Sequence, residues 1–437
     1  MDPLIRNITI FVIALIILIF SGMPIVFALG ILAVGTLFFT YGSNMLLALS
    51  YIGWNSLSNF VIAAIPMFVF MGIMLFETGL SKRVYAGISP LLDRLLPGGL
   101  LHSNIVVGAA FAACSGSTVA SCATIGAVAI PEMEKRGYSR GIAAGSVAAG
   151  STLGTLIPPS VTLIIYGLLT EQSIGKLFIA GIVPGLFLAA IYMIYIASRI
   201  KFQPSLVSGD EQPKYSWRFC LRSLLHVWPV PVLIVAVLGS IYSGFATPTE
   251  AAALGTAVVF IIAAGYRLVN WDSMKRTIRG TVITSSLILV IYMSGRLMGV
   301  YLANSGITSG VATRVSELSV SPLVILVGAV VMYLIMGMLM DGLTMIIITI
   351  PVIFPVMMTL GYDPIWFGLI ATLLTECALL TPPVGMNLFI LQGLRPDYPF
   401  MEIVKGAFPF FLAVLVTIIV MIAFPQLITF LPELVFG

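Results

Sequence analysis

Two pairs of adjacent prolines interrupt segments of the chain that are otherwise apolar. The first, Pro158-Pro159, lies in STLGTLIPPSVTLIIYG (151–167). Prolines break a helix because they lack an amide hydrogen and their ring clashes with the preceding turn. The break leaves carbonyl and amide groups without helical partners, so carbonyl oxygens there suit a cation and half-helix N-termini suit a carboxylate. Hydroxyl oxygens beside this break come from Ser151, Thr152, Thr155 and Ser160, with Ser115, Ser117 and Thr118 in an upstream polar stretch.

The same arrangement recurs around Pro382-Pro383 in TECALLTPPVGMNLFI (375–390). Its oxygen-bearing residues are Asp341, Thr344, Thr375 and Thr381. Two matched clusters predict two quasi-equivalent Na⁺ sites, one beside each break. The alternative is that these small residues only allow helices to pack closely.

The composition places these segments in a membrane. The 437-residue chain is 59% hydrophobic and 9% charged, whereas soluble domains carry about 25% charged residues. Apolar runs of about 20 residues, enough to span a bilayer, recur throughout. The runs lack the alternation typical of a membrane β-barrel, which predicts an all-α polytopic membrane protein. The net charge of +4 is spread among loops and gives no indication of nucleic-acid binding, and the four cysteines have no metal-ligand spacing.

Hydrophobic runs and polar breaks predict ten crossings and two hairpins. The crossings are expected near 4–21, 24–41, 57–77, 139–170, 177–200, 226–243, 249–266, 280–303, 364–391 and 402–432. Two further regions, 100–133 and 322–360, are too long for one span and break at CSGSTVAS (114–121) and MDGLT (340–344). They are predicted to be re-entrant hairpins, which a membrane tolerates where the irregular backbone is buried in protein or lines a cavity.

Loop charges are consistent with this topology. Seventeen of the 21 Lys and Arg residues fall on one side, three on the other, and Arg296 inside a span. The positive-inside rule makes the first side cytoplasmic and both termini periplasmic. Three stretches that mix basic and apolar residues, 81–96, 214–227 and 271–276, are predicted interfacial amphipathic helices. They either frame the membrane surface or contact a subunit.

The chain contains an internal repeat. At an offset of 224 residues, Pro131 aligns with Pro355, and Pro158-Pro159 with Pro382-Pro383. The halves are 1–205 (hairpin 100–133, broken helix 139–170) and 226–437 (hairpin 322–360, broken helix 364–391), joined by a cytoplasmic linker, 206–225, that holds an amphipathic segment. Each half has five crossings, and an odd number inverts the second copy. Inverted repeats with broken helices are typical of secondary transporters, whose sites lie near the midplane.

Asp341, Glu376 and Arg296 lie away from the ends of their predicted membrane segments, where charge is costly and usually functional. Asp341 is expected either to coordinate Na⁺ or to hold the second hairpin tip. Glu376 is expected to line the cavity or to bond to a free backbone amide. Arg296 offers a planar fork for a carboxylate, although snorkelling to the outer interface is the alternative.

Other function classes lack their motifs. The two histidines, His102 and His226, come with neither HExxH nor GxSxG, so an intramembrane hydrolase is not indicated. There is no GxxxxGK[ST] of an ATP-driven pump. A channel remains an alternative, but it needs no inverted repeat with paired hairpins.

Several motifs resemble the large membrane subunit of tripartite ATP-independent periplasmic (TRAP) transporters. They are CSGSTVASCATIGAVAIPEM (114–133), GTLIPPSVTLIIYG (154–167), LFIAGIVPG (177–185), GFATPTEAAA (244–253) and LLTPPVGMNLF (379–389). The resemblance implies Na⁺-coupled uptake of an organic acid by an elevator-type movement across the bacterial inner membrane. It implies two partners, a small four-helix membrane subunit, expected as a separate chain, and a periplasmic solute-binding protein.

The resemblance also implies ligands by position, at the hairpin tips and proline breaks. The implied Na⁺ set, for two or more ions, is Ser115, Gly116, Ser117, Thr118, Gly154, Thr155, Pro158, Gly337, Asp341, Gly342, Thr344, Thr375, Thr381 and Pro382. The implied substrate set is Ser117, Ser160, Arg296, Glu376, Gly385 and Asn387. Ser121 and Ala378 depart from the acidic residue and the glycine that family members often carry, which leaves sialic acid and C4-dicarboxylates both open. The alternative is a single-component divalent-anion/Na⁺ symporter of the related elevator type.

Overall fold

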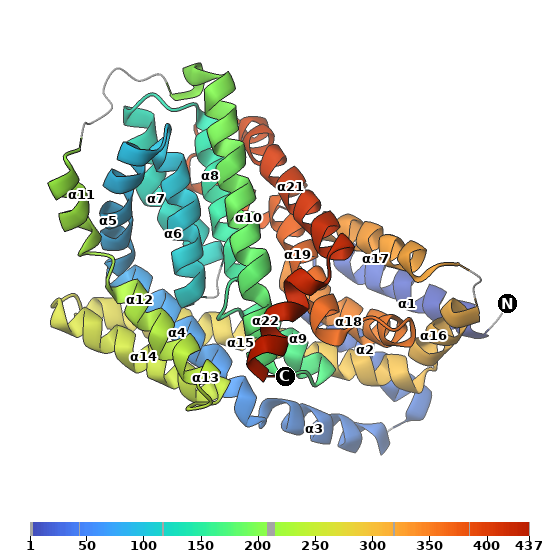
Figure 1. Cartoon of the computed structure of the whole chain (residues 1–437). Coiled ribbons are helices and arrows are strands. Elements are labelled where there is room, and N and C mark those ends of the chain that lie inside the picture. Colours follow the sequence, from blue (N-terminus) through green and yellow to red (C-terminus); the bar gives the residue numbers. More distant parts are fainter. Residues whose placement is uncertain are drawn as a thin grey trace.

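Helices make up all the regular structure in the described part of the chain (Figure 1). The computed structural model describes residues 3–42, 44–115, 118–207, 215–317, 320–383 and 385–436. Seven helical runs among these residues are long and apolar enough to cross a membrane, and several apolar helices of 10–17 residues accompany them. The chain is therefore an all-helical, multi-pass membrane protein.

The first half of the chain contains ten α-helices and ends in a long one. They are α1 (Pro3–Phe20), α2 (Ile25–Tyr41), α3 (Asn44–Leu57), η1 (Phe60–Ala63), α4 (Ala64–Glu77), α5 (Leu80–Leu95), α6 (Gly99–Ser115), α7 (Thr118–Lys135), α8 (Arg140–Thr152), η2 (Leu153–Thr155), α9 (Val161–Thr170) and α10 (Ile174–Phe202). The predicted first hairpin is α6 and α7, and the predicted first broken helix is α8 and α9.

The second half begins with short helices and contains the second hairpin and broken helix. Its elements are η3 (Pro204–Val207), α11 (Trp217–Leu224), α12 (Pro229–Ile234), η4 (Val235–Gly239), α13 (Ser240–Tyr242), α14 (Pro248–Gly265), α15 (Trp271–Asn304), α16 (Ile307–Glu317), α17 (Pro322–Gly337), α18 (Gly342–Thr359), α19 (Pro364–Leu380), α20 (Met386–Leu394), α21 (Phe400–Ala423) and α22 (Gln426–Phe436). The hairpin is α17 and α18, and the broken helix is α19 and α20.

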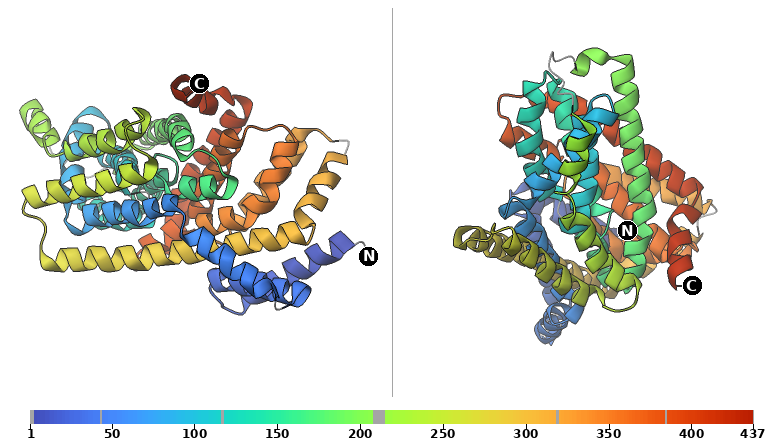
Figure 2. Two further views of the ribbon diagram at one scale, coloured as in Figure 1. Left: turned by 90° about the horizontal axis from the view of Figure 1, so that it is seen from below. Right: turned by 60° about the vertical axis from the view of Figure 1, so that its left-hand side comes forward.

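Two predicted boundaries are wrong. The span expected over 402–432 is two helices, because Pro425 lacks an amide hydrogen and holds Phe424 outside the helical region (φ −128°, ψ 73°). The segment expected as a separate interfacial helix at 271–276 is instead the first part of α15, a continuous helix of 34 residues. No proline interrupts it, and Asn270 and Ser273 cap its start reciprocally. Figure 2 shows α15 running along most of the molecule.

The two broken helices lie at the centre. Every residue of α8 from Gly141 to Thr152 is buried, as is every residue of α19 from Ile365 to Leu380. Helix α8 packs between α6, α7 and α21, and α19 packs against α17, α18, α10 and α21. An element without an exposed face requires small or apolar residues all round, which these two segments have except at Glu376.

Helices α8 and α21 meet at backbone contact, which requires glycine. A Cβ on Gly406 would lie 1.8 Å from the carbonyl oxygen of Gly141, and one on Gly145 would lie 2.2 Å from that of Gly406. Main-chain atoms on a neighbouring helix cannot rotate away as a side chain can. The glycines therefore set the distance between the first broken helix and α21.

This contact predicts that Gly406→Ala destabilises the protein by about 2–3 kcal/mol through overpacking. Thermal unfolding of the purified protein in detergent measures the change. The matched control is Gly328→Ala on α17, where an added Cβ meets nothing within 4 Å and alanine only improves helix propensity. Equal melting temperatures for the two variants would contradict the close approach.

Candidate functional site

The first break is held by hydroxyl groups. Helix α8 ends at Thr152, a short 3₁₀ turn follows, and α9 begins after the cis Pro158–Pro159 bond. Ser160 caps α9 by accepting from the Leu163 amide (3.3 Å), and its hydroxyl donates to the Thr155 carbonyl oxygen (2.5 Å). The Ser160 hydroxyl keeps a lone pair beyond these bonds, so the break remains a source of oxygen ligands.

The second break has the same form. Pro382–Pro383 is also a cis bond, and α20 starts after Gly385, whose φ of 26° favours glycine. The Thr381 hydroxyl donates to the Cys377 carbonyl oxygen (2.6 Å). The proline offset seen in the sequence therefore corresponds to matched backbone geometry at both breaks.

Two side chains of the second broken helix reach the first. The Thr155 hydroxyl donates to Glu376 Oε1 (2.9 Å), and the Thr152 hydroxyl lies 3.5 Å from Oε2. Asn387 donates from its amide to the Ala148 carbonyl oxygen (3.1 Å). All four side chains that take part are buried. These contacts bring the two proline breaks into one polar centre inside an apolar core.

Each hairpin packs on both broken helices. In the first, α6 packs on α8 and α7 on α20, where the Cys122 thiol lies 3.6 Å from the Asn387 carbonyl oxygen. In the second, α17 packs on α19 and α18 on α9, where Tyr166 and Phe354 meet edge to face. The pattern is the same in the two halves with the partners exchanged.

The second hairpin tip lies directly against α19. A Cβ on Gly342 would approach the Thr375 side chain to 2.6 Å, and one on Gly337 would approach Ala378 to 2.8 Å. Asp341 caps α18, accepting from the Thr344 amide (3.1 Å) and hydroxyl (2.6 Å). The structure therefore assigns Asp341 the role of holding the tip, one of its two predicted roles, and leaves the other as a prediction.

Of the two roles expected of Glu376, lining the cavity stays a prediction, and a bond to a free backbone amide is not found among the described residues. Both of its hydrogen-bond partners are hydroxyls, rather than a free backbone amide. No Lys or Arg in the described ranges forms an ion pair with it. A fully buried carboxyl group held by neutral donors alone is available to a cation or a polar ligand.

Arg296 lies apart from this centre. It is on α15, which packs mainly against α2, α4 and α18. Its Nε is buried and, among the described residues, has no hydrogen-bond partner. The residue as a whole is half-buried, so its predicted substrate role and the alternative of snorkelling to the interface both stay predictions.

The remaining members of the predicted sets divide into two groups. Gly154, Thr155, Pro158 and Ser160 lie buried at the first break, together with Thr118 at the start of α7. Gly116 and Ser117 lie outside the described residues, and the Ser115 side chain is not described either, so the first hairpin tip stays a prediction.

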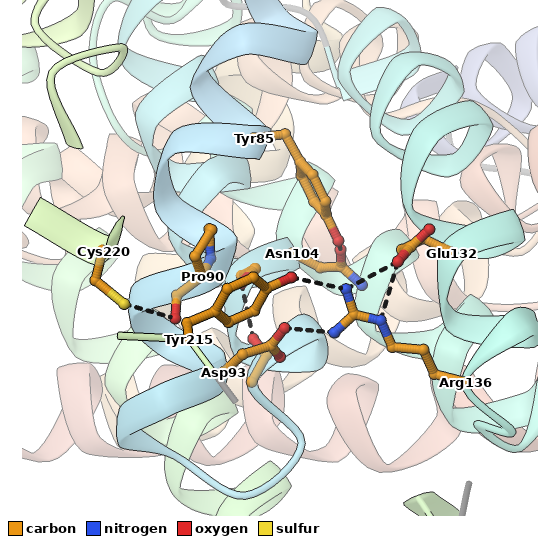
Figure 3. A network of polar contacts seen from close by, with 10 residues as sticks. Tyr85, Pro90, Asp93, Asn104, Glu132, Arg136, Tyr215 and Cys220 are labelled. Atoms are coloured by element: carbon orange, nitrogen blue, oxygen red, sulfur yellow. Dashed lines mark hydrogen bonds and ion pairs between the residues drawn. The ribbon is translucent and has the colours of Figure 1, made fainter. Parts of the chain in front are cut away.

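Sequence reasoning missed two polar clusters at the base of the first hairpin. Arg136 pairs with Asp93 on α5 (2.6 Å) and with Glu132 (2.8 Å) (Figure 3). Glu134 pairs with Arg395 and accepts from the Tyr398 hydroxyl (2.8 Å). The signal was the run PEMEKR (131–136), which had counted only as cytoplasmic charge. Both faces of α7 are thus fixed to neighbours at this end.

The pKa values of two acidic residues in this region are shifted in opposite directions. Hydrogen bonds from Arg395 hold the pKa of Asp397 below its ordinary value. Partial burial raises the pKa of Asp93, although the Arg136 guanidinium opposes that shift.

One cavity is apolar. It measures about 380 Å³ and lies between α17, α21 and the second break. Among the described residues that line it, Thr381 and Pro382 are the only members of the predicted sets, and the Thr381 hydroxyl is the only polar side-chain group. A carboxylate needs more donors than this lining offers, so the cavity marks the second break rather than a finished anion site.

Comparisons with known proteins agree on one family. Residues 12–427 match the model described as "Tripartite ATP-independent periplasmic transporter, DctM component". The "C4-dicarboxylate TRAP transporter large permease protein DctM" of Pseudomonas aeruginosa is 34% identical over 86% of this chain and 87% of its own length. The "Sialic acid TRAP transporter large permease protein SiaM" of Vibrio cholerae is 30% identical over 96% and 97%.

A solved structure shares the fold at low identity. The YdaH transporter of Alcanivorax borkumensis superposes with a TM-score of 0.63 over 89% of this chain and 90% of its own, at 16% identity. This likeness bears on architecture alone.

Proposed function

Because the chain belongs to the family of large permease subunits of TRAP transporters, we propose that it takes up an organic acid across the bacterial inner membrane by Na⁺ symport. The observation that carries the site is the contact of Glu376 with Thr155, which joins the two proline breaks. A carboxylate substrate, either a C4-dicarboxylate or sialic acid, follows from the substrates named for the two relatives.

The two halves form an inverted repeat in this proposal. Its support is the exchange of partners between hairpins and broken helices, together with the matched breaks. A two-fold relation of this kind gives two similar Na⁺ sites. The first takes oxygens from the first hairpin tip and the break at Thr155, and the second takes oxygens from the tip at Asp341 and the break at Thr381.

The substrate carboxylate binds between the two breaks. The N-terminal ends of α9 and α20 present amide groups that suit a negative charge, and Ser160, Gly385 and Asn387 stand at those ends. The buried Asn387 Oδ1 has no partner among the described residues, so it is free to accept a hydroxyl of the substrate. Glu376 sets the charge of the centre.

Alternating access requires the helices that hold the site to move relative to the other helices of the protein. The proposed moving body comprises both hairpins and both broken helices, which pack on one another, and the movement is of the elevator type. Both termini are periplasmic. A small membrane subunit and a periplasmic binding protein complete the transporter, the latter delivering the substrate.

Reconstitution tests this function. Proteoliposomes holding this chain and its small subunit should take up labelled substrate only with an inward Na⁺ gradient and the binding protein present. Succinate and sialic acid, each with a cognate binding protein, separate the two substrate classes. Uptake by this chain without any binding protein would instead favour a single-component symporter.

Arg296 gives a prediction of its own. Because the buried Nε of Arg296 has no hydrogen-bond partner among the described residues, its proposed role is to bind a substrate carboxylate. We expect Arg296→Gln to raise the substrate concentration for half-maximal uptake about tenfold, equivalent to about 1.4 kcal/mol. Arg279→Gln, at an exposed position on the same helix, is the control. Unchanged concentration dependence for Arg296→Gln would remove it from the substrate set.

A further inference from the structure

Helix α11 carries an apolar stripe beside a basic one. Trp217, Leu221 and Leu225 repeat at four-residue spacing and are 50%, 60% and 70% exposed. Arg218 and Arg222 follow the same spacing one position later and are exposed too. At 100° per residue the two stripes lie side by side on the helix surface. Figure 1 places α11 at the outer edge of the molecule.

The opposite face fixes α11 to the protein. Cys220 and Ser223 are buried, and they bond through their side chains to the carbonyl oxygens of Pro90 (3.4 Å) and Gly87 (3.1 Å) on α5. A Cβ on Gly87 would lie 2.9 Å from the Ser223 carbonyl oxygen. The helix is therefore docked in a defined orientation, and its two stripes point away from the chain.

Among the described residues, the basic stripe has no acidic partner. Neither Arg218 nor Arg222 forms an ion pair within the described ranges, and no Asp or Glu occurs between Tyr215 and Pro229. Arg94 adds a third guanidinium, which lies 4.6 Å from the centre of the Trp217 ring. The surface is thus a compact positive patch bordered by apolar side chains.

Aromatic residues mark the level of this patch in the membrane. Trp228, directly before the apolar run that starts at Pro229, donates to the Tyr266 hydroxyl (2.6 Å). Arg83 lies over the Tyr266 ring at 4.8 Å. Tryptophan and tyrosine gather at the boundary between headgroups and acyl chains, so α11 lies beside that boundary.

We propose that α11 binds anionic phospholipid. Arg218 and Arg222 take the lipid phosphate, and Trp217, Leu221 and Leu225 lie among the upper acyl carbons. The charge of the patch complements an anionic headgroup, and the apolar stripe complements its chains. A soluble anion would use the arginines but gain nothing from the stripe.

The site connects to the first hairpin. Tyr215 stacks on Phe219 at the start of α11, its carbonyl oxygen accepts from Arg94, and its hydroxyl lies 3.4 Å from Arg136 (Figure 3). Arg136 in turn is paired with Asp93 and Glu132. A lipid that orders α11 therefore also orders the contact at the base of α7.

Thermal unfolding of the full chain in detergent tests the site without requiring transport. Phosphatidylglycerol and phosphatidylcholine with the same acyl chains are titrated in parallel. The wild-type melting temperature should rise more with phosphatidylglycerol, and the difference should shrink at high salt. Arg218→Gln with Arg222→Gln should lower the apparent affinity for phosphatidylglycerol about 25-fold, because each arginine contributes about fivefold.

Two further variants make the result decisive. Arg6→Gln with Lys176→Gln removes the same charge at exposed positions elsewhere and should keep the wild-type response. Arg218→Lys with Arg222→Lys should restore most of the affinity. Equal responses to both lipids, or a full response in the double glutamine variant, would overturn the proposal. Loss of the small subunit from the double glutamine variant, with lipid affinity intact, would assign the surface to a protein contact instead.

Discussion

Asp341→Asn should lower Na⁺-dependent uptake at least about tenfold while the protein still folds. Asparagine can keep the cap on α18, because its side-chain oxygen accepts from the Thr344 amide as Asp341 Oδ2 does (3.1 Å). What it removes is the negative charge beside the second hairpin tip. The measurement is the initial uptake rate in proteoliposomes as a function of Na⁺ concentration. The Na⁺ concentration that gives the half-maximal rate should rise.

The chain offers a matched control for this substitution. Asp363 caps α19 in the same way, accepting from the Trp366 amide (2.7 Å), and it is not in the proposed Na⁺ set. Asp363→Asn should leave the Na⁺ dependence unchanged. If Asp341→Asn also leaves it unchanged, Asp341 is a structural cap and not an ion ligand.

Glu376→Gln should preserve stability and reduce the maximal uptake rate at least about tenfold. Glutamine keeps an acceptor for the Thr155 hydroxyl, which lies 2.9 Å from Glu376 Oε1, and nearly the same volume. It removes the charge that the proposed centre uses. Glu376→Ala, by contrast, leaves a cavity at a fully buried position, so it should cost about 2–4 kcal/mol of stability.

Melting temperature and uptake are measured on the same preparations. Thr372→Val is the control on α19, since the Thr372 hydroxyl bonds only to the Gly368 carbonyl oxygen in its own helix (2.8 Å). This variant should transport normally. Normal transport by Glu376→Gln, with destabilisation by Glu376→Ala, would show that Glu376 serves packing and not transport.

Local chemistry accounts for what sequence reasoning predicted well. The breaks at Pro158-Pro159 and Pro382-Pro383 follow from proline itself, which cannot supply an amide hydrogen wherever it stands. Both interrupted helices are found there. The two long apolar regions are paired helices because each is too long for one span and has a polar centre. The motif GFATPTEAAA proves to be a helix start, in which Thr247 and Glu250 form a capping box.

Hydropathy alone did not predict the continuity of one helix, the presence of two others and one long-range ion pair. The polar start of α15 resembles a surface helix, yet it continues into an apolar one because nothing in the backbone interrupts it. Helices α3 and α16 were not predicted as helices at all. Nothing in the sequence indicated that Arg136 pairs with Asp93, since the two are 43 residues apart.

By itself, the sequence determined where two membrane helices break and which oxygen-bearing residues stand beside each break. These are properties of proline, of hydroxyl side chains and of apolar length. Only the tertiary structure decided which of those residues meet. Thr155 and Glu376 are 221 residues apart, and Asn387 and Ala148 are 239 apart. They come together because the hairpins pack across both broken helices. Such a pairing depends on tertiary packing between segments distant in the sequence, which no local sequence pattern encodes.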